Sequence, residues 1–159
     1  MGYTMSNPFW DYSVATYRLE GVAPACLALQ DTFDLDVNVL LYAAWLAHRG
    51  YRLTEDHLSE VESLTFDWRE NMVKPLRGLR QYWRECPRAA NIREAIKAVE
   101  LRAEQQQQDE LYALYQRSAE LPHTAQCLRE NLVLVASFDG LEREGRAAAI
   151  ECLVKVLPP

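Results

Sequence analysis

The sequence has little glycine and proline, and it lacks the motifs of the common enzyme sites. Six glycines and seven prolines among 159 residues are too few for a β-sandwich or a low-complexity protein. There is no G-x-S-x-G, G-x-G-x-x-G or G-x-x-x-x-G-K-[ST] stretch, so neither a nucleophile elbow nor a phosphate-binding loop is expected. The three histidines form no H-E-x-x-H pair. We therefore favour a non-enzymatic protein without a cofactor or metal.

Long apolar runs and paired cysteines are also missing. The longest apolar runs, 37–47 and 132–138, fall short of the roughly 20 residues that span a bilayer. The first eight residues hold no Lys or Arg, so we expect no secretory leader. The four cysteines are far apart and form no C-x-x-C pair, which favours reduced thiols. These features predict a cytoplasmic protein that does not enter a membrane.

Positive charge is scarce overall, and apolar residues are plentiful. The net charge is −6, which argues against a nucleic-acid binder that relies on overall positive charge. The hydrophobic fraction of 49% is enough to fill a core, and it excludes a disordered chain.

Apolar residues recur at helical spacing, and no segment alternates as a strand would. We predict an all-α, single-domain bundle of six to eight helices. The segment 37–49 is apolar nearly all round, so it should form the central helix, with Asp36 as its N-cap. The predicted helices cover residues 8–20, 23–34, 37–49, 55–72, 75–86, 92–121, 125–138 and 141–157.

One predicted helix contains an unusual polar stretch. Seven consecutive polar residues, four of them glutamines, occupy 104–110 within the predicted helix 92–121. Side chains of this kind should bury nothing. We therefore expect this stretch either to cross solvent or to mark a break in the helix.

The positive charge that does exist is concentrated in one segment. Between Arg69 and Arg93, seven basic residues stand against two acidic ones. Spacing of three to four places several of them in one stripe of the helix 75–86, with apolar side chains, including Trp83, on the opposite side. We expect the apolar side to face the core and the basic side to face outward. The predicted partner- or anion-binding residues are Lys74, Arg77, Arg80, Arg84 and Arg88.

Two interpretations of the basic stripe remain open. The stripe can pair with the protein's own acidic residues, for instance Glu55, Asp56, Glu60 and Glu62. Alternatively, its guanidinium groups can bind a carboxylate- or phosphate-bearing partner, which they recognise through two parallel hydrogen bonds. An acidic protein surface is then the favoured partner, and an anionic metabolite is another. Nucleic acid is disfavoured because the remaining surface is acidic, and a homo-oligomer stays open.

A carboxylate cluster offers a second kind of site. Asp31, Asp34 and Asp36 lie close together at a predicted helix end, and aspartates one turn apart can hold Mg²⁺ against a diphosphate. Helix capping and turn formation explain the same residues. No second aspartate pair faces this one, so the cluster supports only an alternative function, a small-molecule-binding bundle or enzyme that takes anionic or diphosphate-type ligands.

The N-terminal third resembles a known family. The stretches FWDYSVATY from residue 9, ACLALQD from 25 and DVNVLLYAAWL from 36 are similar to the DUF2390 family, short proteobacterial proteins without an assigned activity. The resemblance runs from about residue 8 to residue 120. It implies a bacterial cytoplasmic setting and no mechanism.

The same stretches contain the polar and aromatic positions that are candidates for a pocket. Asn38 is the unusual one, because it is a polar amide at the start of the most apolar helix. It satisfies backbone groups at the helix entrance, or it lines a pocket. The candidate pocket residues are Trp10, Gln30, Asp31, Asp36 and Asn38. Taken together, the sequence favours an interaction or regulatory module that uses the Arg-rich helix.

Overall fold

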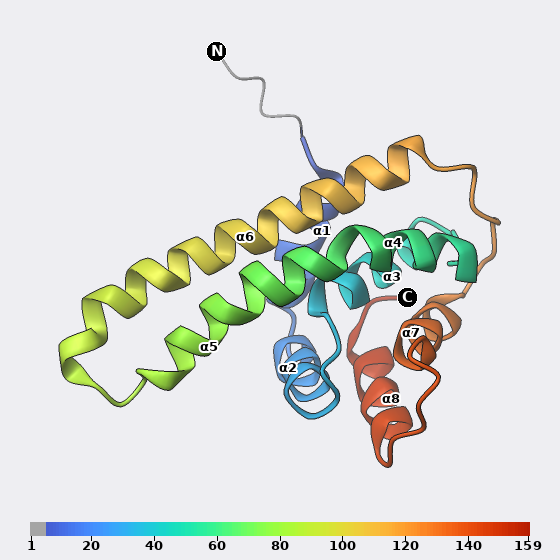
Figure 1. Cartoon of the computed structure of the whole chain (residues 1–159). Helices are drawn as coiled ribbons and strands as arrows, with labels where there is room; N and C mark the ends of the chain where they lie inside the picture. Colours follow the sequence, from blue (N-terminus) through green and yellow to red (C-terminus); the bar gives the residue numbers. More distant parts are fainter. Residues whose placement is uncertain (1–5) are drawn as a thin grey trace.

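The computed structural model describes residues 6–159 and shows an all-α fold (Figure 1). These residues form eight α-helices with one π-helical turn, one short 3-10 helix and no β-strand. The predicted all-α, single-domain fold class is confirmed. The elements are α1 Pro8–Tyr17, α2 Val22–Phe33, α3 Val37–His48, α4 Glu55–Trp68, η1 Arg69–Val73, α5 Lys74–Tyr82, η2 Pro87–Ala89, α6 Ala90–Arg117, α7 Leu128–Ser137 and α8 Arg146–Val156.

Helix α3 is the centre of the fold, as its apolar sequence predicts. Its nine consecutive residues 38–46 are all buried, and α1, α2, α6 and α7 all pack against it. Asp36 begins the helix by accepting hydrogen bonds from the backbone N–H groups of Asn38 and Val39. Two residues after the helix, Gly50 has a φ of 79°, the left-handed conformation that commonly ends helices.

Aromatic side chains fix α1 and α6 on α3. Phe9 of α1 meets Tyr42 with ring centroids 5.4 Å apart, and Trp45 meets Tyr115 of α6 at 4.9 Å. Both pairs are edge-to-face, a preferred arrangement of aromatic rings. The core around α3 therefore holds two helices that lie far apart in the sequence.

The segment from α4 to α5 follows one course, although the sequence predicts separate helices with a break before Pro75. The five residues of η1 form a π-helical turn, closed by the backbone N–H of Lys74 on the carbonyl of Arg69. Proline lacks an N–H and removes one bond of the α-helical ladder. The widened turn directly before Pro75 lets the chain continue into α5.

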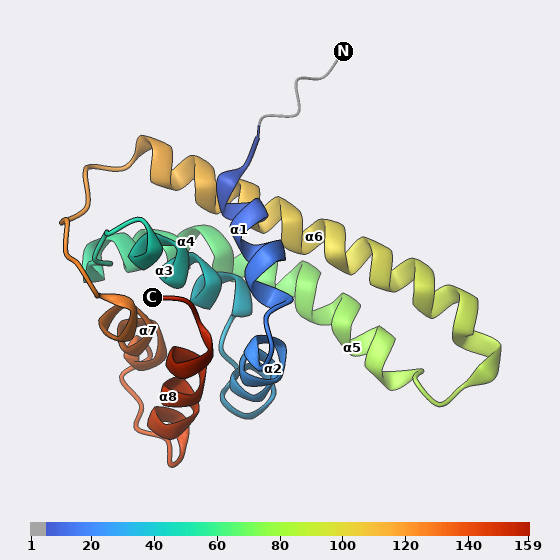
Figure 2. The same ribbon diagram turned by 180° about the vertical axis from the view of Figure 1, so that it is seen from behind.

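Helices α5 and α6 form a long hairpin (Figures 1 and 2). The 28 residues of α6 correspond to a length of about 42 Å. The helix runs without interruption through Gln105–Gln108, so the predicted break there is absent. Both views show α5 and the first half of α6 side by side, extending away from the remaining helices.

The other side of α3 is covered by α7, and α8 packs on both α2 and α7. Asn131 of α7 is fully buried and holds the segment after α3, accepting from the Leu53 N–H and donating to the carbonyls of Ala43 and Tyr51. Helix α8 begins at Arg146, five residues later than the sequence predicts, because Gly145 has a φ of 83°. Within residues 6–159, no helix combines the length and the apolar character needed to cross a membrane.

A glycine series tests the close packing of α8 on the segment before α2. Gly21 has a φ of 85°, and a Cβ there would lie 2.8 Å from Val156 Cγ1. We expect Gly21→Ala to lower the free energy of unfolding by about 2 kcal/mol, from backbone strain and this contact together. Gly140→Ala is the matched control, since its φ is 69° and no heavy atom lies within 4 Å. It should cost only the backbone strain, about 1 kcal/mol.

Urea unfolding measures both values. Gly78→Ala within α5 should instead stabilise the protein by about 0.5–1 kcal/mol, because glycine is unfavourable in the middle of a helix. Equal losses for Gly21→Ala and Gly140→Ala would show that the approach to Val156 has no energetic consequence.

Candidate functional site

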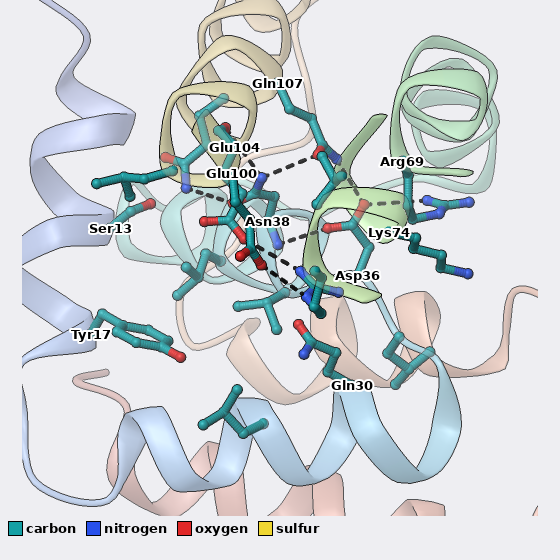
Figure 3. Close-up of a pocket in the computed structure, with 18 of the residues that line it drawn as sticks. Ser13, Tyr17, Gln30, Asp36, Asn38, Arg69, Lys74, Glu100, Glu104 and Gln107 are labelled. Carbon is teal, nitrogen blue, oxygen red and sulfur yellow. Dashed lines mark hydrogen bonds and ion pairs between the residues drawn. The ribbon is translucent and has the colours of Figure 1, made fainter. Parts of the chain in front are cut away.

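A cavity of about 650 Å³ lies between α1, α2, the start of α3, the η1–α5 segment and α6 (Figure 3). This volume is within the range of small-molecule sites in proteins. Its apolar lining comes mainly from the first three helices and includes Trp10, Val14, Tyr17, Leu27 and Leu41. Its charged lining comes mainly from η1, α5 and α6.

The basic side of α5 faces this cavity, so the predicted orientation of the helix is wrong. Lys74, Arg77 and Arg80 all line the cavity. On the opposite side, Leu79 is 50% exposed and Tyr82 is 80% exposed, and Trp83 is exposed as well. Helix α6 offers carboxylates along its contact with α5, and ion pairing with them outweighs burial of the apolar side.

Glu100 is the main partner of the inward basic side chains. It is only 5% exposed. Its Oε1 lies 3.3 Å from Arg77 Nε, and its Oε2 lies 2.5 Å from Arg80 Nε. The hydrogen bond from Arg80 to Glu100 raises the pKa of Arg80 above its ordinary value, although burial opposes this. A buried carboxylate needs partners of this kind, because an unpaired one is several kcal/mol less favourable, on the order of 3–5.

Glu104, one turn further along α6, accepts from Arg77 Nη2 at 3.3 Å. Burial raises the pKa of Glu104, and the nearby carboxylate of Glu100 adds to the effect, whereas Arg77 opposes it. The α5–α6 contact therefore concentrates charge of both signs in a partly dehydrated wall.

The five predicted anion-binding residues do not act as one group. Lys74 pairs with Asp34 at 2.9 Å and with Glu70 at 2.6 Å. Arg84 and Arg88 are exposed and lie outside the cavity lining. The interpretation that the segment pairs with the protein's own carboxylates applies to its inward residues. Arg77 and Arg80 pair with Glu100 and Glu104 of α6. Of the acidic residues named for this role, Glu62 takes part, at 3.0 Å from Arg69.

A chain of buried side-chain amides links α3 to α6. Asp36 Oδ2 accepts from Gln107 Nε2 at 2.7 Å, and from Arg69 Nη1 at 3.4 Å. Gln107 Oε1 accepts from Asn38 Nδ2 at 3.2 Å, and Asn38 Oδ1 accepts from Gln108 Nε2 at 2.9 Å. An ionised carboxylate can only accept hydrogen bonds, so Asp36 fixes the direction of every donor along the chain.

The pKa of Arg69 reflects its place beside this chain. Burial opposes its charge, but the carboxylates of Asp36 and Glu62 more than compensate and raise the pKa above the ordinary value. Arg69 therefore supplies a permanent positive charge next to the carboxylate on which the amide chain depends.

The expectation that the polar stretch 104–110 buries nothing is wrong. Gln107 is 1% exposed and Gln108 is 2% exposed. Their burial has a signal in the sequence, because Ala103, Gln107, Leu111 and Leu114 follow one another at helical spacing. The composition of the stretch concealed this periodicity.

Four of the five predicted pocket residues line the cavity. Trp10, Gln30, Asp36 and Asn38 do so, whereas Asp31 is exposed and accepts from Gln30 Nε2 at 3.2 Å. The Asn38 side chain forms its hydrogen bonds with residues of α6, and not with the backbone at the entrance of its own helix. Lining residues that the sequence reasoning missed as site residues are Ser13, Arg69, Glu100, Glu104, Gln107 and Gln108.

The three aspartates of the predicted cluster, Asp31, Asp34 and Asp36, have separate partners in the structure. Asp34 pairs with Lys74, Asp36 bonds Gln107 and Arg69, and Asp31 lies outside the lining. Within the part of the chain that the structure describes, no group of three or more His, Cys, Asp or Glu side chains is arranged to hold a metal ion.

Comparison with known proteins places the chain in one family. The model of the family described as "Protein of unknown function (DUF2390)" matches residues 8–111, and the chain belongs to this family. No curated protein and no solved structure matches it. The matched region includes α1 to α5 and the part of α6 that carries Glu100, Gln107 and Gln108.

Neighbouring glutamines provide a test of the amide chain. Gln107→Leu should lower the free energy of unfolding by about 2–4 kcal/mol, because Asp36 loses a partly buried hydrogen bond and Asn38 loses a buried one. Gln106→Leu is the matched control. Gln106 is exposed and bonds only Glu110 on its own helix, so this change should cost less than about 0.5 kcal/mol. Urea unfolding measures both values. Equal stability of the two variants would contradict a stabilising role of the amide chain.

Proposed function

We propose that this member of the DUF2390 family binds a small amphipathic anion in the cavity between α1–α3 and the α5–α6 hairpin. One observation carries the proposal: a cavity of small-molecule size has an apolar side and a charged side with an excess of positive charge. Such a division suits a ligand that has a hydrocarbon part and an anionic group.

The charge of the lining supports an anion. The basic residues of the lining are Arg18, Arg69, Lys74, Arg77, Arg80 and Lys97, and its acidic residues are Asp34, Asp36, Glu100 and Glu104. Arg18 and Lys97 form no ion pair within 4.0 Å among residues 6–159. Two cations are thus in place for a ligand without displacing an internal carboxylate.

The way in which Glu100 is held indicates the kind of anion. Arg80 donates to both of its oxygens, through Nε and Nη2, and Arg77 donates to Oε1. This wall already binds one carboxylate with the paired geometry that guanidinium groups provide. A carboxylate is therefore the first ligand group to test. A cytoplasmic, bacterial setting without a cofactor stays a prediction.

Octanoate and 1-octanol are suitable probes, because they share a hydrocarbon chain and differ in charge. We expect octanoate to bind about tenfold more tightly at low salt, the effect of one charge-assisted hydrogen bond. The double variant Arg18→Ala/Lys97→Ala should lose this difference and keep the affinity for octanol. Isothermal titration calorimetry measures all four affinities.

A cavity-filling variant separates the cavity from the surface. Val14→Trp should abolish binding of both probes, since Val14 lines the cavity, whereas Val133→Trp places the same side chain at an exposed position of α7. Saturable binding that survives in Val14→Trp, or no binding of octanoate to the unchanged protein, would contradict the proposal.

An acidic protein partner on the outer side of the hairpin is the second candidate, in line with an interaction module. It is favoured by exposed Leu79, Tyr82 and Trp83 next to the exposed cations Arg84 and Arg88. Aromatic and arginine side chains are enriched where proteins bind each other.

A photo-crosslinking residue at Tyr82, introduced in the native host, should give discrete crosslinked species with an acidic protein. The same residue at exposed Phe138 of the α7 end is the control. Identical crosslinking patterns at the two positions would contradict a partner on the hairpin.

A further inference from the structure

The side of the α5–α6 hairpin that faces away from the cavity carries two rows of exposed apolar side chains. Met72, Leu79 and Trp83 follow one another at helical spacing in and just after the η1–α5 segment, and Ile92 and Val99 do so on α6. Helical geometry places both rows opposite the side chains of the same helices that line the cavity. Rows of this kind are typical of helices that pack on further helices.

Along the course from α4 to α5, the charge changes sign. Helix α4 has five acidic residues and no Lys or Arg, whereas residues 74–93 include six basic residues and one acidic residue. Among residues 6–159, exposed Glu60 forms no ion pair within 4.0 Å, and the one partner of exposed Arg84 is the adjacent Glu85. Figures 1 and 2 show α4 and α5 following each other along α6. This segment is therefore complementary in charge to a second copy of itself in antiparallel orientation.

A shallow hollow of about 480 Å³ continues the first apolar row onto α4. It is lined by Ser59, Glu60, Ser63 and Leu64 of α4 and by Leu114 and Arg117 of α6. Leu64 precedes Met72 by eight residues, which one α-helical turn and the widened turn of η1 span, so the hollow and the row lie on one side. At the other end of the segment, the exposed ring of Tyr82 is a side chain that such a hollow can receive.

We propose, building on the second candidate function, that its acidic protein partner is a second copy of this chain, which itself has a net charge of −6. The two copies pack antiparallel through the two apolar rows, around a twofold axis at Met72. Glu60 and Arg84 are each 12 residues from Met72. This axis therefore brings Arg84 of each copy to Glu60 of the partner subunit, and Tyr82 to the partner's hollow. Each contact occurs twice, as in any isologous dimer.

The size of this face suits a specific dimer. Glu60 and Arg84 are 24 residues apart, which corresponds to about 36 Å of helix. Two helices side by side are about 20 Å wide, so the face covers roughly 700 Å² in each copy. Specific interfaces bury about 800 Å² per partner.

Reciprocal charge reversal tests the antiparallel pairing. Sedimentation velocity of the unchanged protein should show a dimer at about 100 μM, above the micromolar Kd of the weaker interfaces of this size. Arg84→Glu and Glu60→Arg should each weaken dimerisation roughly 30-fold, because each variant places two like-charged pairs in the dimer. An equimolar mixture of the two variants should dimerise as tightly as the unchanged protein, since every pair in the mixed dimer is again opposite in charge.

Lys155→Glu is the matched control, because Lys155 is an exposed cation of α8, which packs on α2 and α7. This variant should dimerise like the unchanged protein.

A photo-crosslinking residue at Tyr82 of the purified protein locates the contact. In a mixture of ¹⁵N-labelled and unlabelled copies, mass spectrometry should identify crosslinks between copies that join position 82 to residues 59–64 or 114–117. Crosslinks between copies that map elsewhere would contradict the register around Met72.

A protein that is monomeric at about 100 μM, or a mixture that dimerises no better than either variant alone, would overturn this dimer. In the first case, a discrete crosslinked species at Tyr82 in the native host would support a different acidic partner. Both charge variants should keep the affinity for octanoate, because Glu60 and Arg84 lie outside the cavity lining. Failure of the dimer and failure of the anion-binding cavity are thus measured independently.

Discussion

The carboxylate of Asp36 is the constraint on which the rest of the site depends. One of its oxygens begins the central helix by capping Asn38 and Val39, and the other holds Gln107 and Arg69. Because a carboxylate only accepts hydrogen bonds, a single side chain sets the start of α3, the contact of α3 with α6, and the direction of the amide chain. The buried, unpaired acceptor Gln108 Oε1 is the last consequence of that direction.

The inverted α5 follows from the same region of α6. Glu100 and Glu104 lie on the side of α6 that continues into Gln107 and Gln108, so the carboxylates that attract Arg77 and Arg80 occur on the wall that the amide chain positions. Turning α5 to satisfy these charges leaves its apolar side exposed. Charge pairing thereby closes one wall of the cavity, and a candidate protein-binding surface is left on the outside of the hairpin.

Local patterns were sufficient for the fold class and for α3, because its apolar residues extend nearly all round and Asp36 marks its beginning. They failed where two distant segments decide the outcome. The spacing of Lys74, Arg77 and Arg80 identified a basic face, but its direction depends on Glu100, which no local rule connects with α5. The run of polar residues gave no indication that Gln107 and Gln108 are buried. Their partners Asp36 and Asn38 lie 71 and 70 residues away along the chain. The positions of Asp36 and Asn38 at the start of an apolar helix identified them as site residues. The sequence did not identify their partners.

Exchange of the glutamine side-chain amide protons with solvent, measured by NMR on protein labelled with ¹⁵N in the glutamine side chains, tests the amide chain most directly. Gln107 and Gln108 should exchange far more slowly than Gln105 and Gln106, because their amide groups are buried and donate to Asp36 and Asn38. Replacing Asp36 with alanine should accelerate exchange at both positions. Equal, fast exchange at all four glutamines would contradict the account.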